Sequence, residues 1–419
     1  MKFLILLLFL ISFFSNTHSA NAQWVRDSTI FGNALIYHNG YTFIGKDGVS
    51  KSSDNGQSWM RSDSGFSTLG TERKVNCFLS TGNILLAGVD IKSIYRTTND
   101  GLNWAVSNTG LSGGFSVKCM MKKDSVIYAG GDDGVYYSTN NGSSWQVSSI
   151  QLYAKSVIAL NYIGNRLIAS VEPSSVAEGI YLSTNNGSSW YKSINGLHAF
   201  AHLYSITVHR NNLVFVTSDD GKIYKSTNQG SSWLLSTDAS VIDPFFNPVY
   251  ASASFNLSLV VGCNNGIYMS TNAGSNWFRY SFGIPPGTQF QVNSIVQCGP
   301  YIFAPGNNGT YKIPTGTIGI DQISSNIPEK FELQQNYPNP FNPVTKINFR
   351  IPLNSFIELK VCDIQGREVK TLYTGYVAVG EYGAEFDGSG LNSGIYFCTL
   401  KVTGSSGTQL VTRKMLLIK

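Results

Sequence analysis

The chain has 419 residues, and only 13% of them are charged, about half the share of an ordinary soluble protein. A formal net charge of +5 over this length excludes a nucleic-acid-binding surface and a charged tail, and a hydrophobic content of 42% excludes a disordered chain. Aromatic residues make up another 13%, and the chain holds 42 glycines. This composition predicts an all-β protein that is too long for one small domain.

Residues 1–22 have the pattern of a cleaved export signal. Lys2 precedes an apolar run over 3–14, and Ala20 and Ala22 provide the small side chains that signal peptidase requires. The run is too short to cross a bilayer, which takes about 20 apolar residues. We therefore expect a signal peptide at 1–22, a mature chain that starts at the next residue, and no transmembrane segment after cleavage.

An eight-residue phrase that ends in tryptophan recurs six times further along the chain. Its first copy reads Ser-Ser-Asp-Asn-Gly-Gln-Ser-Trp over 52–59, and successive tryptophans are 41 to 45 residues apart. The hydroxyl at position one and the Asp or Asn at position three can bond to the backbone of a tight turn, the glycine tolerates positive φ, and the tryptophan anchors the next strand. This period fits one four-stranded propeller blade per copy. The residues expected to hold these turns are Asp54 and Trp59, Asn99 and Trp104, Asn140 and Trp145, Asn185 and Trp190, Asn228 and Trp233, and Asn272 and Trp277.

The phrase resembles the Asp-box, or bacterial neuraminidase repeat, in which Ser-x-Asp-x-Gly-x-x-Trp closes the hairpin between the two outer strands of a propeller blade. The acid survives only in the first copy, and asparagine replaces it in the other five. The last repeat, over 292–313, lacks a box and its tryptophan strand, whereas residues 23–26 look like the strands that begin at Trp59 and Trp277. The resemblance therefore implies a seven-bladed β-propeller over 23–314, in which the first strand completes the last blade.

The repeat stops after Pro314, where we expect a linker over 315–328 and a second domain over 329–419. Short alternating runs bounded by Pro, Asn and Gly predict about seven strands of a small Ig-like β-sandwich. The run Tyr-Pro-Asn-Pro-Phe-Asn-Pro at 337–343 and the final Lys-Met-Leu-Leu-Ile-Lys resemble the type A C-terminal sorting domain of the type IX secretion system. The residues taken as the sorting signal are Pro338, Pro340, Gly394, Lys414 and Lys419.

This second resemblance implies the route and the destination of the protein. A periplasmic intermediate would cross the outer membrane of a Bacteroidota-like cell, with the type IX translocon and sortase-like machinery as partners. In such proteins the domain is usually removed while the cargo is released or attached to the surface. We therefore expect a protein that is secreted or held on the outer cell surface.

The six cysteines match no zinc-binding pattern and are too sparse for a disulfide framework, so we expect neither a metal site nor a cofactor. Cys77 and Cys119 occupy the same place in adjacent repeats, which equivalent core positions explain. Cys362 and Cys398 lie in strands that could be neighbours, and a disulfide between them stays an open possibility.

Asp-box propellers include sialidases, which hold the substrate carboxylate with three arginines and use a tyrosine nucleophile. The arginines of the predicted propeller all fall in outer strands, turns or connections, so a sialidase is not expected. A glucanase of this fold would need two carboxylates that face each other across a cleft. The longest departures from the repeat lie on the loop face opposite the boxes, and the ligand-binding candidates there are Glu172, Glu178, His198, His202, Asp243, Phe245 and Phe246.

These candidates differ in how well a structural role explains them. Glu178 stands before a glycine, where other repeats carry Asp or Asn, so a turn role is the simpler explanation. His198 and His202 are four residues apart in a loop, and that spacing predicts a metal pair only on a helix. Glu172 has no comparable explanation.

Loops rich in Tyr, Phe, Asn and Ser on a rigid ring suit stacking on sugars or contact with protein surfaces. We therefore predict a non-catalytic binding protein for a glycan or a protein ligand, exported through its C-terminal domain. The alternative is a glucanase-like Asp-box glycoside hydrolase that uses Glu172. Two carboxylates from different blades within about 10 Å of each other would favour the enzyme.

Overall fold

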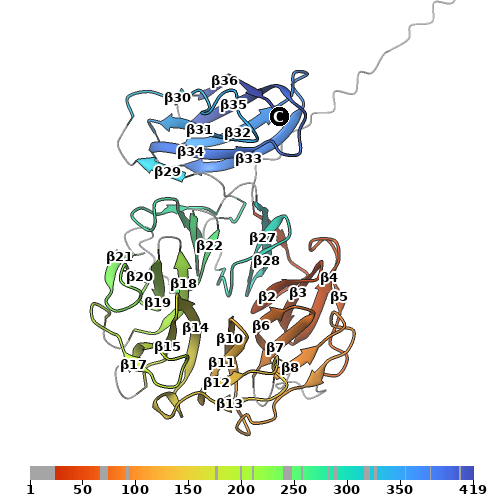
Figure 1. The fold of residues 1–419 in the computed structure, drawn as a ribbon, viewed down its shortest axis with the longest axis vertical. Coiled ribbons are helices and arrows are strands. Elements are labelled where there is room, and N and C mark those ends of the chain that lie inside the picture. Colours follow the sequence, from red (N-terminus) through yellow and green to blue (C-terminus); the bar gives the residue numbers. More distant parts are fainter. Residues whose placement is uncertain are drawn as a thin grey trace, which may run out of the picture.

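The computed structural model describes residues 24–66, 74–90, 94–174, 178–198, 201–209, 212–238, 248–255, 258–281, 283–285, 290–315, 321–324, 328–353, 355–377, 379–404 and 407–419. Its regular structure is almost all β-strand, in a ring of sheets followed by a second all-β domain (Figure 1). The prediction of a seven-bladed β-propeller followed by a β-sandwich is therefore confirmed.

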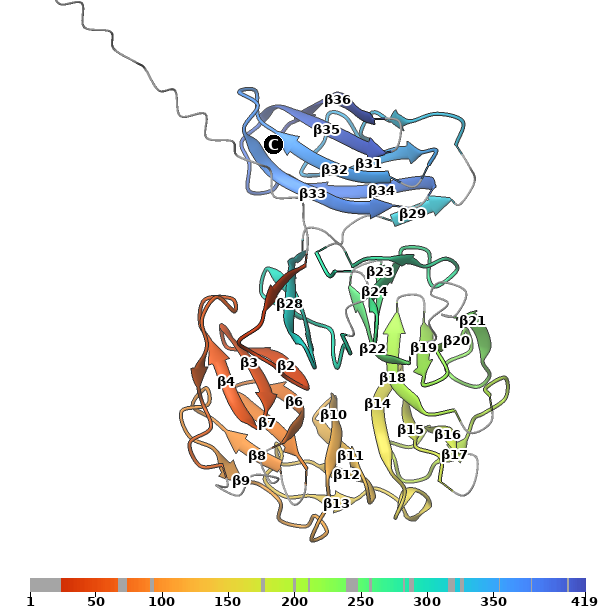
Figure 2. The ribbon, with the colours of Figure 1, turned by 180° about the vertical axis from the view of Figure 1, so that it is seen from behind.

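Seven antiparallel sheets of four strands succeed one another around the ring (Figure 2), and we number them as blades 1 to 7. Blades 1 to 3 consist of β2 (Ala34–His38), β3 (Tyr41–Lys46), β4 (Gly48–Ser52) and β5 (Met60–Arg61); β6 (Val75–Thr81), β7 (Ile84–Val89), β8 (Ile94–Thr97) and β9 (Ala105–Val106); and β10 (Val117–Lys123), β11 (Val126–Gly131), β12 (Gly134–Ser138) and β13 (Gln146–Val147). Blades 4 to 6 consist of β14 (Val157–Ile163), β15 (Arg166–Val171), β16 (Gly179–Ser183) and β17 (Tyr191–Lys192); β18 (Leu203–His209), β19 (Leu213–Ser218), β20 (Lys222–Ser226) and β21 (Leu234–Asp238); and β22 (Val249–Phe255), β23 (Ser258–Cys263), β24 (Gly266–Ser270) and β25 (Phe278–Arg279). A short 3₁₀ helix, Ile150–Leu152, connects blades 3 and 4.

Blade 7 combines the two ends of the propeller. It contains β26 (Val296–Cys298), β27 (Tyr301–Gly306) and β28 (Gly309–Pro314), and its outer strand is β1 (Val25–Asp27) from the start of the chain. β1 pairs antiparallel with β28, with Val25 opposite Lys312. The Trp24 indole is 1% exposed and donates its N–H to the Tyr280 carbonyl oxygen of blade 6 at 2.8 Å. The ring therefore closes between its first strand and its last repeat.

The six box turns share one hydrogen-bond pattern. In blade 3, Ser138 Oγ donates to Asn140 Oδ1 at 2.8 Å and accepts from the Gly142 N–H at 2.9 Å, while Asn140 Oδ1 accepts from the Ser144 N–H at 2.9 Å. Equivalent bonds form in each of the other five boxes. Because an amide oxygen accepts these bonds as a carboxylate does, five boxes hold their turn without a charge.

Three of the six box tryptophans, Trp104, Trp145 and Trp233, also form a hydrogen bond to the preceding blade. The indole N–H of Trp104 donates to the Ser62 carbonyl oxygen of the preceding blade at 2.8 Å, and Trp145 does the same to Ser107 at 2.9 Å. Both rings are buried. Trp24 makes the equivalent bond from blade 7 to blade 6. It therefore has the same structural role as Trp104 and Trp145.

The second domain is a sandwich of two four-stranded sheets. One sheet has the order β29 (Asp321–Ser324), β34 (Gly380–Asp387), β31 (Val344–Ile351) and β30 (Glu332–Leu333), and the other has the order β33 (Glu368–Val377), β32 (Ser355–Cys362), β35 (Gly394–Gly404) and β36 (Gly407–Leu417). The sequence predicted about seven strands, preceded by a linker over 315–328. The structure differs there, because β29 lies inside that range and pairs with β34.

The segments that carry the sorting motifs meet in this sandwich. The Phe341 N–H donates to the Leu416 carbonyl oxygen at 2.9 Å, and the Ile418 N–H donates to the Phe341 carbonyl oxygen at 3.0 Å. Asn339 Oδ1 accepts from the Leu416 N–H at 2.9 Å, and the Lys419 N–H donates to Ser393 Oγ at 2.9 Å. Two of the three peptide bonds that precede a proline in the first motif, those before Pro338 and Pro340, are cis.

The described cysteines are all free thiols. Cys362 lies opposite Phe397 in the β32–β35 pair, whereas Cys398 lies opposite Val361. Adjacent positions of a strand face opposite sides of the sheet, so this register turns the two thiols away from each other and no disulfide forms. Cys77 and Cys119 both lie in inner strands, and burial raises the pKa of Cys119 to about 12.

Candidate functional site

One end of the ring gathers charged side chains at equivalent points of successive blades. In blades 2 to 5 the residue after the second strand is acidic, and its N–H donates to the carbonyl oxygen of the residue before the inner strand at 2.8 to 3.2 Å. The equivalent backbone bonds place these acids at the same level around the ring. We call them the acidic rim, which consists of Asp90, Asp132, Glu172 and Asp219.

The inner strands add a second row of side chains beside the acidic rim. The strand register shifts at the second residue of the inner strand in blades 2 to 6, which is a β-bulge at the same position each time. A bulge leaves its extra residue unpaired and turns that side chain in a new direction, and bulges are frequent next to functional sites. The bulge residues are Asn76, Lys118, Ile158, Tyr204 and Tyr250.

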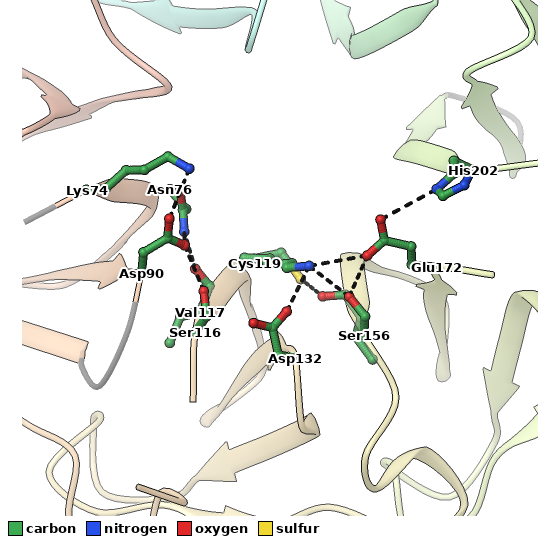
Figure 3. A network of polar contacts seen from close by, with 12 residues as sticks. Lys74, Asn76, Asp90, Ser116, Val117, Cys119, Asp132, Ser156, Glu172 and His202 are labelled. Carbon is green, nitrogen blue, oxygen red and sulfur yellow. Dashed lines mark hydrogen bonds and ion pairs between the residues drawn. The ribbon is translucent and has the colours of Figure 1, made fainter. Parts of the chain in front are cut away.

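Lys118 is the centre of a polar network that joins blades 3 and 4. Figure 3 labels its partners Asp132, Ser156 and Glu172. Its Nζ lies 2.8 Å from Asp132 Oδ1, 2.8 Å from Ser156 Oγ and 3.3 Å from Glu172 Oε2. Ser156 Oγ also donates to Glu172 Oε2 at 2.8 Å. Partial burial raises the pKa of Glu172, but the Ser156 hydrogen bond and the Lys118 charge outweigh it and hold the pKa below its ordinary value. Glu172 is therefore a charged acceptor at neutral pH.

Asp90 forms a second, smaller group in blades 2 and 3 (Figure 3). Asn76 Nδ2 and Ser116 Oγ both donate to Asp90 Oδ1 at 2.7 Å, and Lys74 Nζ lies 2.9 Å from Asp90 Oδ2. Burial again raises the pKa of Asp90, and these three partners together lower it below the usual range. This carboxylate is thus held charged and in a fixed position.

Aromatic side chains of blades 5 and 6 lie beside the acidic rim. The rings of Tyr204 and Tyr250 lie 5.0 Å apart at 43°, and the His202 ring lies 6.5 Å from that of Tyr204 at 28°. His202 Nδ1 is 3.5 Å from Glu172 Oε1, which links this side to the Lys118 network. The pKa of the Tyr204 hydroxyl is raised, mainly by burial and further by the nearby Tyr250, Asp219 and Glu172. Tyr204 is therefore neutral, whereas a tyrosine nucleophile needs the opposite shift.

The structure brings together two of the residues singled out in the sequence, Glu172 and His202. Glu178 instead has a side chain that is only 4% exposed, with Lys155 Nζ at 2.5 Å and Lys192 Nζ at 3.2 Å. His198 is exposed, with Nδ1 3.7 Å from Asp220 Oδ2. Asp243, Phe245 and Phe246 lie outside the described residues.

Two carboxylates from different blades do approach each other at the acidic rim. Because one ammonium contacts both, Asp132 Oδ1 and Glu172 Oε2 lie within the span of the two contacts, at most about 6 Å. Asp132, Lys118, Tyr204 and Tyr250 were not among the candidates read from the sequence. The signal in the sequence that could have found them is the acid that recurs after the second strand of blades 2 to 5.

Within the described ranges, no three His, Cys, Asp or Glu side chains are grouped as metal ligands. No helix among those residues is long and apolar enough to span a membrane.

Comparison with known families identifies the C-terminal domain. Residues 335–417 match the model of the secretion system C-terminal sorting domain. This domain exports the protein across the outer membrane through the type IX secretion system, to the cell surface or the medium. No curated protein sequence matches the chain.

Solved structures similar to the chain are β-propellers of low sequence identity. YCF48 bound to a D1 peptide is 13% identical at a TM-score of 0.57, and the alignment covers 70% of this chain and 96% of that one. PorZ, a surface component of the type IX secretion system of Porphyromonas gingivalis, is 14% identical at a TM-score of 0.55, covering 93% of this chain and 59% of that one. The extracellular domain of the two-component system BT4673 from B. thetaiotaomicron is 11% identical at a TM-score of 0.53, covering 95% and 59%. Likeness at this identity establishes the fold and not the function.

Proposed function

We propose that the exported protein is a non-catalytic binding protein, and that its propeller holds a glycan or a protein ligand at the acidic rim. The observation that carries the proposal is that three of the four rim carboxylates, those of Asp90, Asp132 and Glu172, each form an ion pair with Lys74 or Lys118. A glycoside hydrolase needs one carboxylic acid whose pKa is raised so that it can donate a proton. Among the described residues, every carboxyl group with a shifted pKa is shifted downward.

The aromatic side of the rim supports binding in another way. Tyr204 and Tyr250 present half-buried rings on a rigid scaffold, and ordering them costs little conformational entropy on binding. YCF48, which shares the propeller fold, was solved with a bound peptide. A propeller of this fold can therefore carry a ligand, although the likeness does not choose between a glycan and a protein.

A glucanase-like hydrolase is the second candidate, because Asp132 and Glu172 come within the separation that paired catalytic carboxylates require. The test is to incubate the full mature chain with neutral β-glucans and measure new reducing ends, beside the Asp132→Asn and Glu172→Gln variants. We expect the unmodified chain to release no more reducing ends than the two variants do. Turnover that either variant abolishes would replace the binding function with hydrolysis.

The sorting signal has its own test. Removal of 414–419 takes away Leu416 and Ile418, which bond to Phe341 across the sandwich. We expect the truncated protein to accumulate in the periplasm and the full chain to reach the surface or medium, as measured by fractionation and immunoblotting. Undiminished export of the truncated chain would refute the role of this segment. We further propose that sortase-like machinery acts on the exported form.

A further inference from the structure

The Lys118 network offers hydrogen-bond acceptors and no donors to a ligand. A lysine ammonium has three N–H groups, and those of Lys118 are directed to Asp132, Ser156 and Glu172. The Ser156 hydroxyl proton also goes to Glu172. Asp132 is half exposed, and among the described residues its Oδ2 receives no hydrogen bond. A ligand group at this point must therefore donate a hydrogen bond.

The charges around the network restrict which donors can bind. An anionic ligand would meet three acidic side chains in succession, those of Asp90, Asp132 and Glu172 (Figure 3). A cationic ligand would have to sit beside Lys118 or displace it, and a like charge at short range costs affinity. A hydroxyl group donates a hydrogen bond without carrying charge, so it fits both constraints.

The aromatic side supplies the second half of the site. Glu172 contacts His202, His202 stacks on Tyr204, and Tyr204 packs against Tyr250, so the polar network and the rings form one continuous row over blades 3 to 6. An aromatic face binds the apolar face of a ligand ring, while the hydroxyls at the edge of that ring remain available for hydrogen bonds. A sugar combines these two surfaces.

We propose that the acidic rim binds a neutral carbohydrate, whose hydroxyls donate to Asp132 and Glu172 and whose ring face stacks on Tyr204 and Tyr250. The inference rests on the proposed binding function and narrows its ligand. It also disfavours sialic acids and uronic acids as ligands, because they carry the charge that the rim carboxylates repel.

The test uses the full mature chain on a panel of neutral and anionic oligosaccharides, followed by calorimetric titration of the best neutral ligand. We expect neutral glycans to bind and their uronic-acid counterparts to bind at least about tenfold more weakly. Tyr204→Ala and Tyr250→Ala should each weaken binding by about tenfold. Tyr162→Ala and Tyr191→Ala remove exposed tyrosines outside the row and should leave binding unchanged.

The outcomes distinguish the inference from the function on which it rests. Binding of anionic glycans in preference to neutral ones, or equal losses in all four tyrosine variants, would overturn the carbohydrate site described here. If no glycan binds, the inference fails, while binding of a protein ligand remains open to the proposed function. If a neutral glycan binds and is cleaved, the ligand class stands and the non-catalytic function fails.

Discussion

The box turns and the acidic rim belong to the same propeller but differ in how strictly they repeat. Each box repeats one set of hydrogen bonds, and all but the first hold that set with a neutral asparagine. The inner strands beside the rim form the same β-bulge in blades 2 to 6, but the side chain at the bulge differs from blade to blade. It is Asn76, Lys118, Ile158, Tyr204 and Tyr250 in turn. The repeat thus fixes the parts that hold a blade together and leaves the rim side chains free to differ, which is where a ligand site can arise.

The largest effect is expected from the tryptophan that closes the ring. Trp24→Ala should lower the free energy of unfolding by about 3–5 kcal/mol, because it removes a fully buried side chain and its hydrogen bond to Tyr280. Val25→Ala, at an exposed neighbour on the same strand, should cost less than about 0.5 kcal/mol. Urea unfolding of both variants measures the difference. Equal costs would mean that β1 is not needed to hold the ring.

A variant at the acidic rim should lower stability less than Trp24→Ala does, and its effect on stability should depend on pH. Lys118→Met removes the cation between Asp132 and Glu172, and because these groups are partly exposed we expect a loss of about 1 kcal/mol at neutral pH. The lowered pKa of Glu172 gives a stabilisation that is present above the ordinary value of 4.5 and is lost as the pH falls through the folded value. Without Lys118 the folded pKa of Glu172 shifts up toward 4.5, so the stability that is lost on acidification should be smaller.

Melting temperatures measured between neutral and acid pH test this shift, and Lys346→Met, at an exposed position of the sandwich, is the control. A parallel pH curve for Lys118→Met and the wild type would show that the ammonium does not set the ionisation of Glu172.

The smallest effect is expected in the one box that keeps its acid. Asp54→Asn should leave the melting temperature at neutral pH within about 2 °C, because the other five boxes hold the same turn with asparagine. The Ser58 hydroxyl and N–H and the Ser52 hydroxyl lower the pKa of Asp54. Its contribution is therefore present above 3.8 and lost as the pH falls through the folded value. The variant should lack this acid-dependent step, and a large loss at neutral pH would show that the charge is needed.

The fold could be predicted because its signals are local and repeated. A tryptophan phrase at blade spacing sets the number of blades, and the N-terminal tryptophan indicates the missing strand. Short elements without such a signal were missed, and β29 is the example, since its four residues form a strand only where the edge of β34 is available.

The site was only partly predictable, because its contacts cross from one blade to the next. Glu172 stood out for lacking a turn role, and it does lie in the network. Lys118 looks like any polar residue of an alternating strand until a bulge redirects it and ring closure brings Ser156 beside it. The sequence favoured a turn role for Glu178, but it could not show that Lys155 and Lys192 contact the buried carboxylate of this residue.

The closing strand also has a consequence for the order of synthesis. β1 is made before any other strand of the ring, yet Trp24 and its partner Tyr280 are 256 residues apart and β28 follows later still. β1 can therefore pair with β28 only after almost the entire propeller has been synthesised. The sorting domain comes after β28 in the chain. A polypeptide that carries the complete sorting domain is thus long enough to have closed its ring, whereas one that ends before β28 has neither the closed ring nor the sorting domain.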